Sequence, residues 1–438
     1  MSGHSCRRMQ RVLVQFTRSY SEGGRHYKVV IAGGGTGGCS VGARACRTFG
    51  RGNVAIIEPA KHHYYQPMWT LVGAGIKQVE NSSALMKDVL PSGCHHYEQR
   101  VQEFNPEKNT VILSNGEKLS YDYLVIGLGI QINLNKVEGL IPALKADRNV
   151  CTNYVREYVE KTFPAIQDFR GGNAIFTFPN TPIKCAGAPQ KIMYLADEYW
   201  RKAGVRDKAT VMFNTSLGVI FGVKKYAASL MPIVERKGIQ LNLRRNLVSV
   251  DHSKKTATFE LLDSEKGEKI TYDYDFLHVA PPMSAPDILK NSTSPIVDAS
   301  GFLDVNKLTC QHNKFPNIFG VGDCTNIPTA KTAAAIASQN KIVHTGIKEV
   351  EAGKQPSGQY DGYTSCPLIT GYHHCILAEF GFEGVPLETF PLNQAKERRT
   401  MFHMKKDIMP EIYWNMLLKG YWGGPKPYRK IMHLGTGK

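Results

Sequence analysis

Several features that would place this chain in a simple class are missing from it. Its 10 cysteines include no C-x-x-C pair, which disfavours a zinc ribbon and a thioredoxin-type site. No apolar stretch reaches about 18 residues, so no segment is expected to span a bilayer. Lysine and arginine never form a long run and no known nucleic-acid-binding module occurs, so we expect no nucleic-acid partner.

What is present indicates a globular protein of two or three domains. The chain has 438 residues, 42% of them hydrophobic, which is enough to fill large cores. Its net charge of +16 predicts attraction to an anionic membrane or a small anion.

The N-terminal segment has arginines and lacks acidic residues. The arginines are Arg7, Arg8, Arg11 and Arg18, and wound as a helix they would lie opposite Met9, Val12, Leu13 and Phe16. This composition predicts a mitochondrial presequence over residues 1–22, and a disordered basic tail is the alternative.

A glycine-rich turn lies between an apolar strand at 28–32 and a helical stretch that ends near Thr48. Gly33, Gly35 and Gly38 match G-x-G-x-x-G, and Glu58 closes the next predicted strand, 53–58. With a third strand at 121–129 this predicts a parallel α/β unit that binds a dinucleotide. The glycines would admit the pyrophosphate, the helix N-terminus would hold its charge, and Glu58 would accept hydrogen bonds from the ribose.

The second unit begins with the same pattern but without the fingerprint. A strand at 174–178, a helix at 190–202 and a strand at 210–214 are predicted, and strands at 277–280 and 317–323 follow. Between the first strand and helix stand Pro179, Pro182 and Cys185, where a nicotinamide-binding turn would have glycines. The late Gly-Asp turn at Asp323, followed by an Ala-rich helix at 332–338, favours FAD over NAD in the first unit.

We therefore expect an α/β fold with two Rossmann-like dinucleotide-binding domains, similar to glutathione reductase. The expected parts are an FAD-binding domain in two pieces (23–150 and 296–360), a second Rossmann-like domain (151–295) and a C-terminal region (361–438) that is aromatic, basic and interrupted by glycine and proline.

Two cysteines are the candidates for redox chemistry. Cys185 follows Lys184 and precedes a predicted helix, and both features favour the thiolate. Cys366 lies in a predicted loop after Asp361-Gly362, and taken alone it is better explained as structural. Cys39 lies in the helix of the dinucleotide unit, and we assign it a structural role.

The chain resembles the eukaryotic sulfide:quinone oxidoreductases from about residue 27 to the C-terminus. The segments that carry the resemblance are 65–73, 177–187, 322–324, 331–334, 363–367 and 421–424. The resemblance implies that Cys185 and Cys366 face each other across FAD as a disulfide. Hydrosulfide would attack the disulfide, Cys366 would carry the sulfane sulfur as a persulfide, and Cys185 would pass two electrons to the flavin. Ubiquinone would accept the electrons, and a thiol such as glutathione would accept the sulfur.

The same resemblance implies a set of FAD contacts. Together with the fingerprint glycines, the predicted cofactor residues are Gly33, Gly35, Thr36, Gly37, Gly38, Glu58, Gln66, Val101, Asp323, Lys331, Thr332, Ala333 and Ala334. No attachment motif surrounds Cys39 or Cys46, so we predict noncovalent FAD. No metal is expected.

Residues 408–420 are predicted to form an amphipathic helix. Its apolar positions are Met409, Ile412, Tyr413, Met416 and Leu417, and lysines including Lys405, Lys406 and Lys419 flank it. This suits a helix lying on the mitochondrial inner membrane, where ubiquinone resides. The alternative is a core helix that docks on the flavin domain.

Three other functions share parts of this pattern. A type II NADH:quinone dehydrogenase has the same architecture, but the missing second fingerprint disfavours it. A flavocytochrome-type sulfide dehydrogenase would require a haem partner. A non-catalytic FAD-binding protein would require an inert Cys185 and Cys366.

Overall fold

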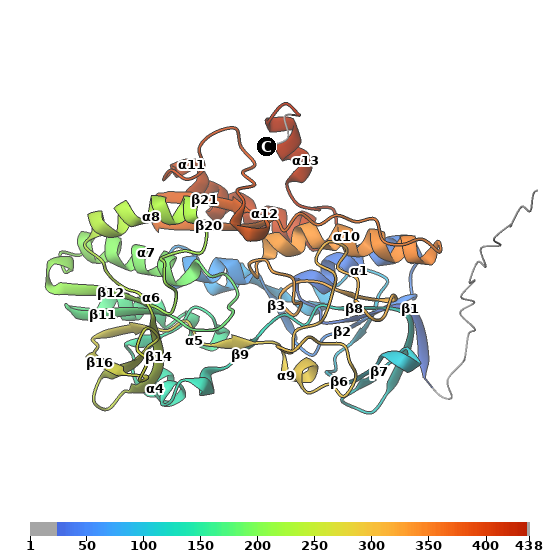
Figure 1. The fold of residues 1–438 in the computed structure, drawn as a ribbon, viewed down its shortest axis with the longest axis horizontal. Helices are drawn as coiled ribbons and strands as arrows, with labels where there is room; N and C mark the ends of the chain where they lie inside the picture. Colours follow the sequence, from blue (N-terminus) through green and yellow to red (C-terminus); the bar gives the residue numbers. More distant parts are fainter. Residues whose placement is uncertain (1–23, 436–438) are drawn as a thin grey trace, which may run out of the picture.

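The computed structural model describes residues 24–435, and two β-sheets lie side by side in it, the first mixed and the second parallel (Figure 1). The predicted presequence, residues 1–22, lies outside the described residues. The first sheet has the order β5-β2-β1-β8-β7-β6, with β19 paired in parallel to β8. Its strands are β1 (Arg25–Ala32), β2 (Val54–Ile57), β5 (His95–Tyr97), β6 (Val101–Asn105), β7 (Thr110–Leu113), β8 (Lys118–Ile126) and β19 (Ile318–Gly320).

Burial explains the composition of the central strands. Residues 29–32 of β1 and all of β2 are buried, as expected for parallel strands covered on both faces. Helix α1 (Thr36–Phe49) packs on β1 and β2, and α10 (Ala333–Glu351) packs beside α1. The return of β19 to the first sheet brings the turn at Asp323 next to the glycine-rich turn after β1.

The second sheet is parallel throughout, in the order β10-β17-β11-β12-β13. Its strands are β10 (Val150–Cys151), β11 (Gly172–Phe178), β12 (Ala209–Thr215), β13 (Gln240–Asn242) and β17 (Phe276–His278). Helix α7 (Ala188–Lys202) packs on β11 and β12. An antiparallel sheet of β14 (Arg245–Asp251), β15 (Thr256–Leu261) and β16 (Lys269–Asp273) follows α8 (Lys224–Lys237).

Short elements complete the two units. Small antiparallel pairs are formed by β3 (His62–Tyr64) with β4 (Ser83–Leu85), and by β9 (Gln131–Ile132) with β18 (Met283–Ser284). The short helices are α2 (Trp69–Val72), α3 (Met86–Val89), α4 (Leu140–Ala146), α5 (Arg156–Val159), α6 (Thr162–Asp168) and α9 (Asp287–Lys290).

The C-terminal region lies over both units. A hairpin of β20 (Thr364–Gly371) and β21 (His374–Phe380) packs on α7. The chain then forms α11 (Arg399–His403), a π turn at Met404–Ile408, α12 (Met409–Ile412), a second π turn at Tyr413–Leu417, and α13 (Lys426–Met432). In Figure 1 these C-terminal helices lie along one side of the molecule.

The predicted α/β class with two Rossmann-like units is confirmed. Each predicted strand and helix of the two units is present, although α10 is much longer than the stretch 332–338. One prediction is wrong: Cys366 lies within strand β20, not in a loop. Proline at 367 suggested a loop, but β20 pairs on one side only, with β21, so a proline is tolerated there. The predicted domain boundaries stay predictions.

Candidate active site

A cavity of about 870 Å³ connects the two units and the C-terminal helices. Its walls come from the turn after β1, the turn after β19, the start of α7, the β20–β21 hairpin and the segment from Met404 to Met432. Among the predicted site residues, Gly33, Gly35, Thr36, Gly37, Glu58, Gln66, Val101, Asp323, Lys331, Thr332, Ala333, Ala334 and Cys185 line it. Gly38 lies behind this wall, and the thiol of Cys366 contacts the start of α7 near Gly187.

The glycine-rich turn has the geometry of a phosphate cradle. Gly33 adopts φ +102° and donates its N–H to the carbonyl of Ile57 at 2.9 Å. A Cβ on Gly38 would collide with the Gly33 carbonyl, so this glycine is needed for close packing. A Cβ on Gly35 would meet no atom within 4 Å, because that side of the backbone faces the cavity. Oε2 of Glu58 accepts the Gly34 N–H at 2.8 Å and fixes the turn.

The turn after β19 presents a buried carboxylate to the same cavity. Oδ1 of Asp323 is buried and has no hydrogen-bond partner among residues 24–435, and burial raises the pKa of this carboxyl group. Lys331 donates its ammonium to the backbone carbonyls of Asp323 (2.7 Å) and Thr325 (3.1 Å). Thr332 caps α10 by accepting the Ala335 N–H at 3.1 Å. An unpartnered buried oxygen indicates that Asp323 is built to receive a hydroxyl-bearing ligand.

Cys185 is held in a strained backbone conformation at the entrance to α7. Its φ of +50° is rare for a residue with a side chain. Its N–H donates to the Lys331 carbonyl at 2.9 Å, and its carbonyl accepts the Tyr154 hydroxyl at 3.2 Å. These bonds join the second unit to the segment that follows Asp323, so the thiol is positioned relative to the predicted flavin site.

Cys366, on strand β20, approaches Cys185 at the start of α7. A Cβ on Gly187 would lie only 2.5 Å from the Cys366 Sγ, so this glycine makes room for the thiol. The side chains of Cys185 and Cys366 share a hydrogen bond, which lowers the pKa of the Cys185 thiol and raises that of Cys366. The two sulfurs are therefore neighbours, and Cys185 is the member of the pair that ionises first.

Two buried lysines stabilise the Cys185 thiolate. Nζ of Lys191, from the first turns of α7, lies 3.2 Å from the Cys185 Sγ, and its side chain is almost fully buried. Burial opposes the charge on Lys191, but the neighbouring thiols outweigh it and raise its pKa. Lys405 also contributes positive charge; burial lowers its pKa to about 8. We expected Lys405 to face a membrane, but its ammonium donates to the Pro67 carbonyl at 2.9 Å inside the protein.

Other cysteines lack these features. Burial raises the pKa of Cys39, Cys151, Cys310 and Cys375, and the Cys39 thiol donates to the Gly34 carbonyl at 3.1 Å. The structural role predicted for Cys39 agrees with this environment.

A network that the sequence did not reveal ties the C-terminal helices to the glycine-rich turn. The hydroxyl of Tyr413 is 2.8 Å from the Thr36 Oγ1 and 2.6 Å from the Nε2 of His63. Burial lowers the pKa of His63 to about 4, so the imidazole is neutral. Tyr413 and Leu417 are buried in the core. This side of residues 408–420 therefore fits the alternative prediction, a core helix that docks on the flavin domain.

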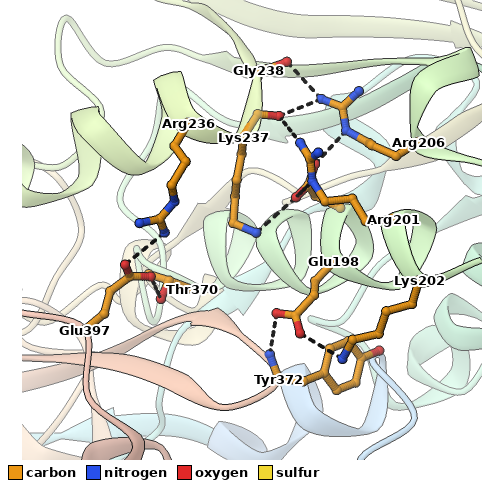
Figure 2. Close-up of polar contacts among 11 residues, drawn as sticks. Glu198, Arg201, Lys202, Arg206, Arg236, Lys237, Gly238, Thr370, Tyr372 and Glu397 are labelled. Atoms are coloured by element: carbon orange, nitrogen blue, oxygen red, sulfur yellow. Dashed lines mark hydrogen bonds and ion pairs between the residues drawn. The ribbon is translucent and has the colours of Figure 1, made fainter. Parts of the chain in front are cut away.

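An ionic network fixes the far ends of the elements that carry the two cysteines (Figure 2). Asp197 of α7, fully buried, is paired with Arg206 (2.6 Å), Lys237 (3.0 Å) and Arg201 (3.1 Å). Next to it, Glu198 accepts the Tyr372 N–H at 2.9 Å, at the end of β20. A second contact of β20 runs from Thr370 to Glu397, at 2.6 Å, and Glu397 pairs with Arg236 at 2.9 Å. Together these contacts hold α7 and β20 in a fixed relation.

The opposite end of the cavity is apolar and open to the C-terminal helices. Its lining there includes Phe390, Ile408, Trp422, Tyr428, Ile431 and Met432. Ile431 of α13 is 70% exposed and Tyr428 is 50% exposed, so α13 presents apolar side chains outside the protein. In the described part of the chain, no helix combines the length and apolar character needed to cross a membrane. Helix α13 was not predicted from the sequence, although its apolar residues alternate with Lys426, Arg429 and Lys430.

Comparison with known proteins agrees with this architecture. Residues 27–162 match the family described as pyridine nucleotide-disulphide oxidoreductase. A mitochondrial sulfide:quinone oxidoreductase of Mus musculus is 52% identical over 94% of this chain and 90% of its own length, and one of Dictyostelium discoideum is 42% identical over 91% and 87%. The solved structure of the Aquifex aeolicus sulfide:quinone oxidoreductase shares the fold, with a TM-score of 0.76 at 17% identity over 94% of this chain and 96% of that one. At these identities and coverages, the chain belongs to the sulfide:quinone oxidoreductase family.

Proposed function

We propose that this enzyme oxidises hydrogen sulfide at Cys185 and Cys366, transfers two electrons through FAD to ubiquinone, and gives the sulfane sulfur to a thiol such as glutathione. The observation that carries the proposal is the Cys185 thiol between the Lys191 ammonium and the Cys366 thiol, in the same cavity as the glycine-rich turn. We place it in the mitochondrion, on the inner membrane.

The first step starts from a Cys185–Cys366 disulfide. Hydrosulfide attacks the Cys366 sulfur, the S–S bond breaks, and Cys185 leaves as a thiolate while Cys366 becomes a persulfide. Lys191 stabilises the leaving thiolate, and the lowered pKa of Cys185 makes it the better leaving group. Lys191 and Lys405 also attract the hydrosulfide anion into the cavity.

The second step removes the sulfane sulfur. The thiolate of an acceptor attacks the terminal sulfur of the persulfide, so a new persulfide forms on the acceptor and Cys366 leaves as a thiolate. The two thiolates then re-form the disulfide and release two electrons. Two protons and these electrons convert the quinone to a quinol, so atoms and charge balance over the cycle.

The chain's residues fit a flavin. Gly33, Gly35 and the start of α1 would hold the pyrophosphate, and Asp323 would accept a hydrogen bond from the ribityl chain or ribose through its unpartnered oxygen. Bound FAD would accept the electron pair from sulfur and donate it to quinone. Cys185 is anchored to Lys331 beside this site, so the thiol is oriented toward it.

The apolar end of the cavity suits a quinone that enters from a membrane. Trp422, Tyr428 and Ile431 line this end, and Tyr428 and Ile431 also extend outside the protein on α13. A short amphipathic helix with Lys426 and Lys430 beside exposed apolar residues suits an anionic interface. We infer that α13, more than the helix at 408–420, makes the membrane contact.

NADH is disfavoured as the electron donor by the residues of the second turn. Pro179, Pro182 and Cys185 occupy the place where a nicotinamide-binding unit has glycines. The acid expected at the end of the next strand is replaced by Asn214, which is fully buried and accepts a hydrogen bond from Asn242 at 3.0 Å.

The test is a steady-state assay with sulfide, a ubiquinone analogue and glutathione. We expect quinone reduction that requires sulfide, together with formation of glutathione persulfide. Cys185→Ser should lose this activity, and Cys94→Ser is the control for cysteine loss, because Cys94 lies outside the cavity lining. Quinone reduction with NADH and none with sulfide would overturn the proposal, and persulfide on a different thiol would overturn only the acceptor.

A further inference from the structure

A second cavity, of about 320 Å³, is basic and lies apart from the active site. It is formed by α10, α1 and the residues just after α10. Its lining consists of Arg44, Lys341, His344, Thr345, Lys348, Glu349, Ala352 and Lys354. Four of these side chains are permanent cations, and this charge is not used in the proposed reaction.

Neutral partners hold Arg44 and the imidazole of His344 in this cavity. Nε of Arg44 donates to Oδ1 of Asn340 at 2.8 Å, and His344 forms a 2.8 Å hydrogen bond with Thr48. The single carboxylate in the lining, Glu349, accepts the N–H and hydroxyl of Ser357. These hydrogen bonds and the charge of Lys354 lower the pKa of Glu349, so one carboxylate faces four cations.

The cations of the cavity outnumber its one carboxylate, so a net positive charge remains among the described residues of its lining. In residues 24–435, Arg44, Lys341, Lys348 and Lys354 form no ion pair. Arg44 is partly buried, and burial together with Arg47 lowers its pKa. Burial and the neighbouring cations lower the pKa of His344 to about 4, so this imidazole stays neutral. A partly buried guanidinium without a counter-ion is unfavourable, and an anion in the cavity would relieve that cost.

The cavity adjoins the segment proposed to contact the membrane. The loop 420–424 packs over α1 and α10: Asn340 donates to the Trp422 carbonyl at 3.1 Å, and Arg47 lies 4.6 Å above the ring of Tyr421. Tyr421 is 65% exposed, and the loop leads directly into α13. In Figure 1, α10 and α13 lie on the same side of the molecule.

We propose that this cavity binds the phosphate of an anionic phospholipid headgroup from the membrane on which α13 lies. This rests on the membrane contact in the proposed function and adds a specific lipid site to it. The volume suits a small headgroup, and the cluster of cations suits a phosphate anion. The cavity lies next to the exposed aromatic and apolar side chains of the loop 420–424 and α13. A lipid headgroup in the cavity would lie in the same membrane interface as these side chains, which favours a lipid over a soluble phosphate.

The test is sedimentation of the FAD-loaded protein with vesicles of phosphatidylcholine alone and of phosphatidylcholine with phosphatidylglycerol. The variant Lys341→Ala/Lys348→Ala removes two cavity cations. Lys266→Ala/Lys269→Ala is the matched control; it removes the same charge from the exposed segment that includes the start of β16, far from α10 in Figure 1. A lysine near an anionic surface contributes roughly fivefold to binding, so we expect about 25-fold weaker binding for the cavity variant. The control should change by less than about twofold.

Two results would overturn the proposal. Absence of vesicle binding by the unchanged protein would remove the membrane contact itself. Equal vesicle binding by the cavity and control variants would show that these lysines make no headgroup site; if the cavity variant alone then loses binding of inorganic phosphate, measured without vesicles at constant ionic strength, the cavity takes a soluble phosphate. Sulfide-dependent quinone reduction in detergent, measured in parallel, reports separately on the proposed function, and we expect the cavity variant to retain it.

Discussion

The two strand–turn–helix units of this enzyme share a topology but differ in the chemistry of the turn. After β1, glycines leave the backbone bare, and the Cα of Gly35 faces an open cavity. After β11, prolines and Cys185 fill the equivalent place, and Cys185 adopts a φ of +50° that glycine usually supplies. The first turn offers backbone N–H groups to a phosphate, whereas the second offers a thiol. The same strand–turn–helix topology therefore presents different chemical groups in the two units.

The same difference extends to charge. The first turn depends on the N-terminus of α1, a partial charge that suits a bound phosphate. At the second turn, a full positive charge on Lys191 lies 3.2 Å from a sulfur atom that must become an anion. A fixed cation beside the nucleophilic residue is a direct way to lower its pKa.

The largest expected effect comes from the sulfur of the second turn. We expect Cys185→Ser to reduce sulfide-dependent turnover by at least about 10³-fold, because a nucleophile and leaving group are lost together. FAD content should be unchanged, since Cys185 is anchored through its backbone. Turnover within tenfold of the unchanged enzyme would show that the second turn is not a sulfur site.

A pH profile tests the charge of the second turn. The hydrogen bond with Cys366 and the charges of Lys191 and Lys405 lower the pKa of the Cys185 thiol. Lys191→Met removes the cation that lies 3.2 Å from the sulfur, so the pKa should rise and the rate of sulfide-dependent flavin reduction should shift to higher pH. At neutral pH we expect a loss of about tenfold or more, recovered as the pH is raised. Lys191→Arg, which keeps a cation, should shift the profile much less. An unshifted profile for Lys191→Met would contradict this role.

The first turn can be broken by adding a side chain to it. Gly35→Val should project into the cavity and weaken FAD binding about tenfold, since overpacking costs on the order of 1–3 kcal/mol. The FAD remaining after desalting measures the effect. Gly222→Val is the control, because a Cβ at Gly222 also meets no atom within 4 Å but lies outside the cavity lining. Equal FAD retention by both variants would refute a phosphate cradle at Gly35.

The smallest expected effect on turnover concerns the ionic network behind α7, because changes there act on stability and not on the reacting groups. Arg206→Met leaves Asp197 with less compensation and should lower the free energy of unfolding by about 3 kcal/mol. Arg201→Met should cost at most about 1 kcal/mol, because the Arg201 side chain is 43% exposed. Urea unfolding of the two variants provides the comparison. An equal loss in free energy of unfolding in both variants would contradict the prediction that the more buried partner of Asp197 contributes more to stability.

The sign of the pH effect on this network follows from Asp197. Burial raises the pKa of its carboxyl group, but Lys237, Arg206 and Arg201 outweigh burial and bring the pKa below the ordinary value. The stabilisation is therefore present above the ordinary carboxyl pKa and is lost as the pH falls below it. The difference in free energy of unfolding between the unchanged enzyme and Arg206→Met should therefore become smaller at acidic pH.

Periodicity and turn chemistry predicted most of the fold, but the three-dimensional site required tertiary information. The buried strands and the fingerprint glycines are local signals, and so is the missing fingerprint that singled out Cys185. The proximity of Cys185 to Cys366, and of His63 to Tyr413, depends on elements far apart in the chain. The sequence gives no local signal for such contacts.

Lys405 shows a second reason why part of the site could not be predicted from the sequence. Counted as a charge on a regular helix, it was expected at the surface. Lys405 lies within a π turn at Met404–Ile408 and is 2% exposed. Regular helical periodicity does not anticipate such a turn.

Anaerobic titration of the FAD-loaded enzyme with sulfide, and separately with NADH, tests the difference between the two turns most directly. The measured quantity is the absorbance band of the oxidised flavin. We predict that sulfide bleaches this band, that a ubiquinone analogue restores it, and that NADH leaves it unchanged. Bleaching by NADH without bleaching by sulfide would show that the second turn still serves a nicotinamide, and would contradict the account.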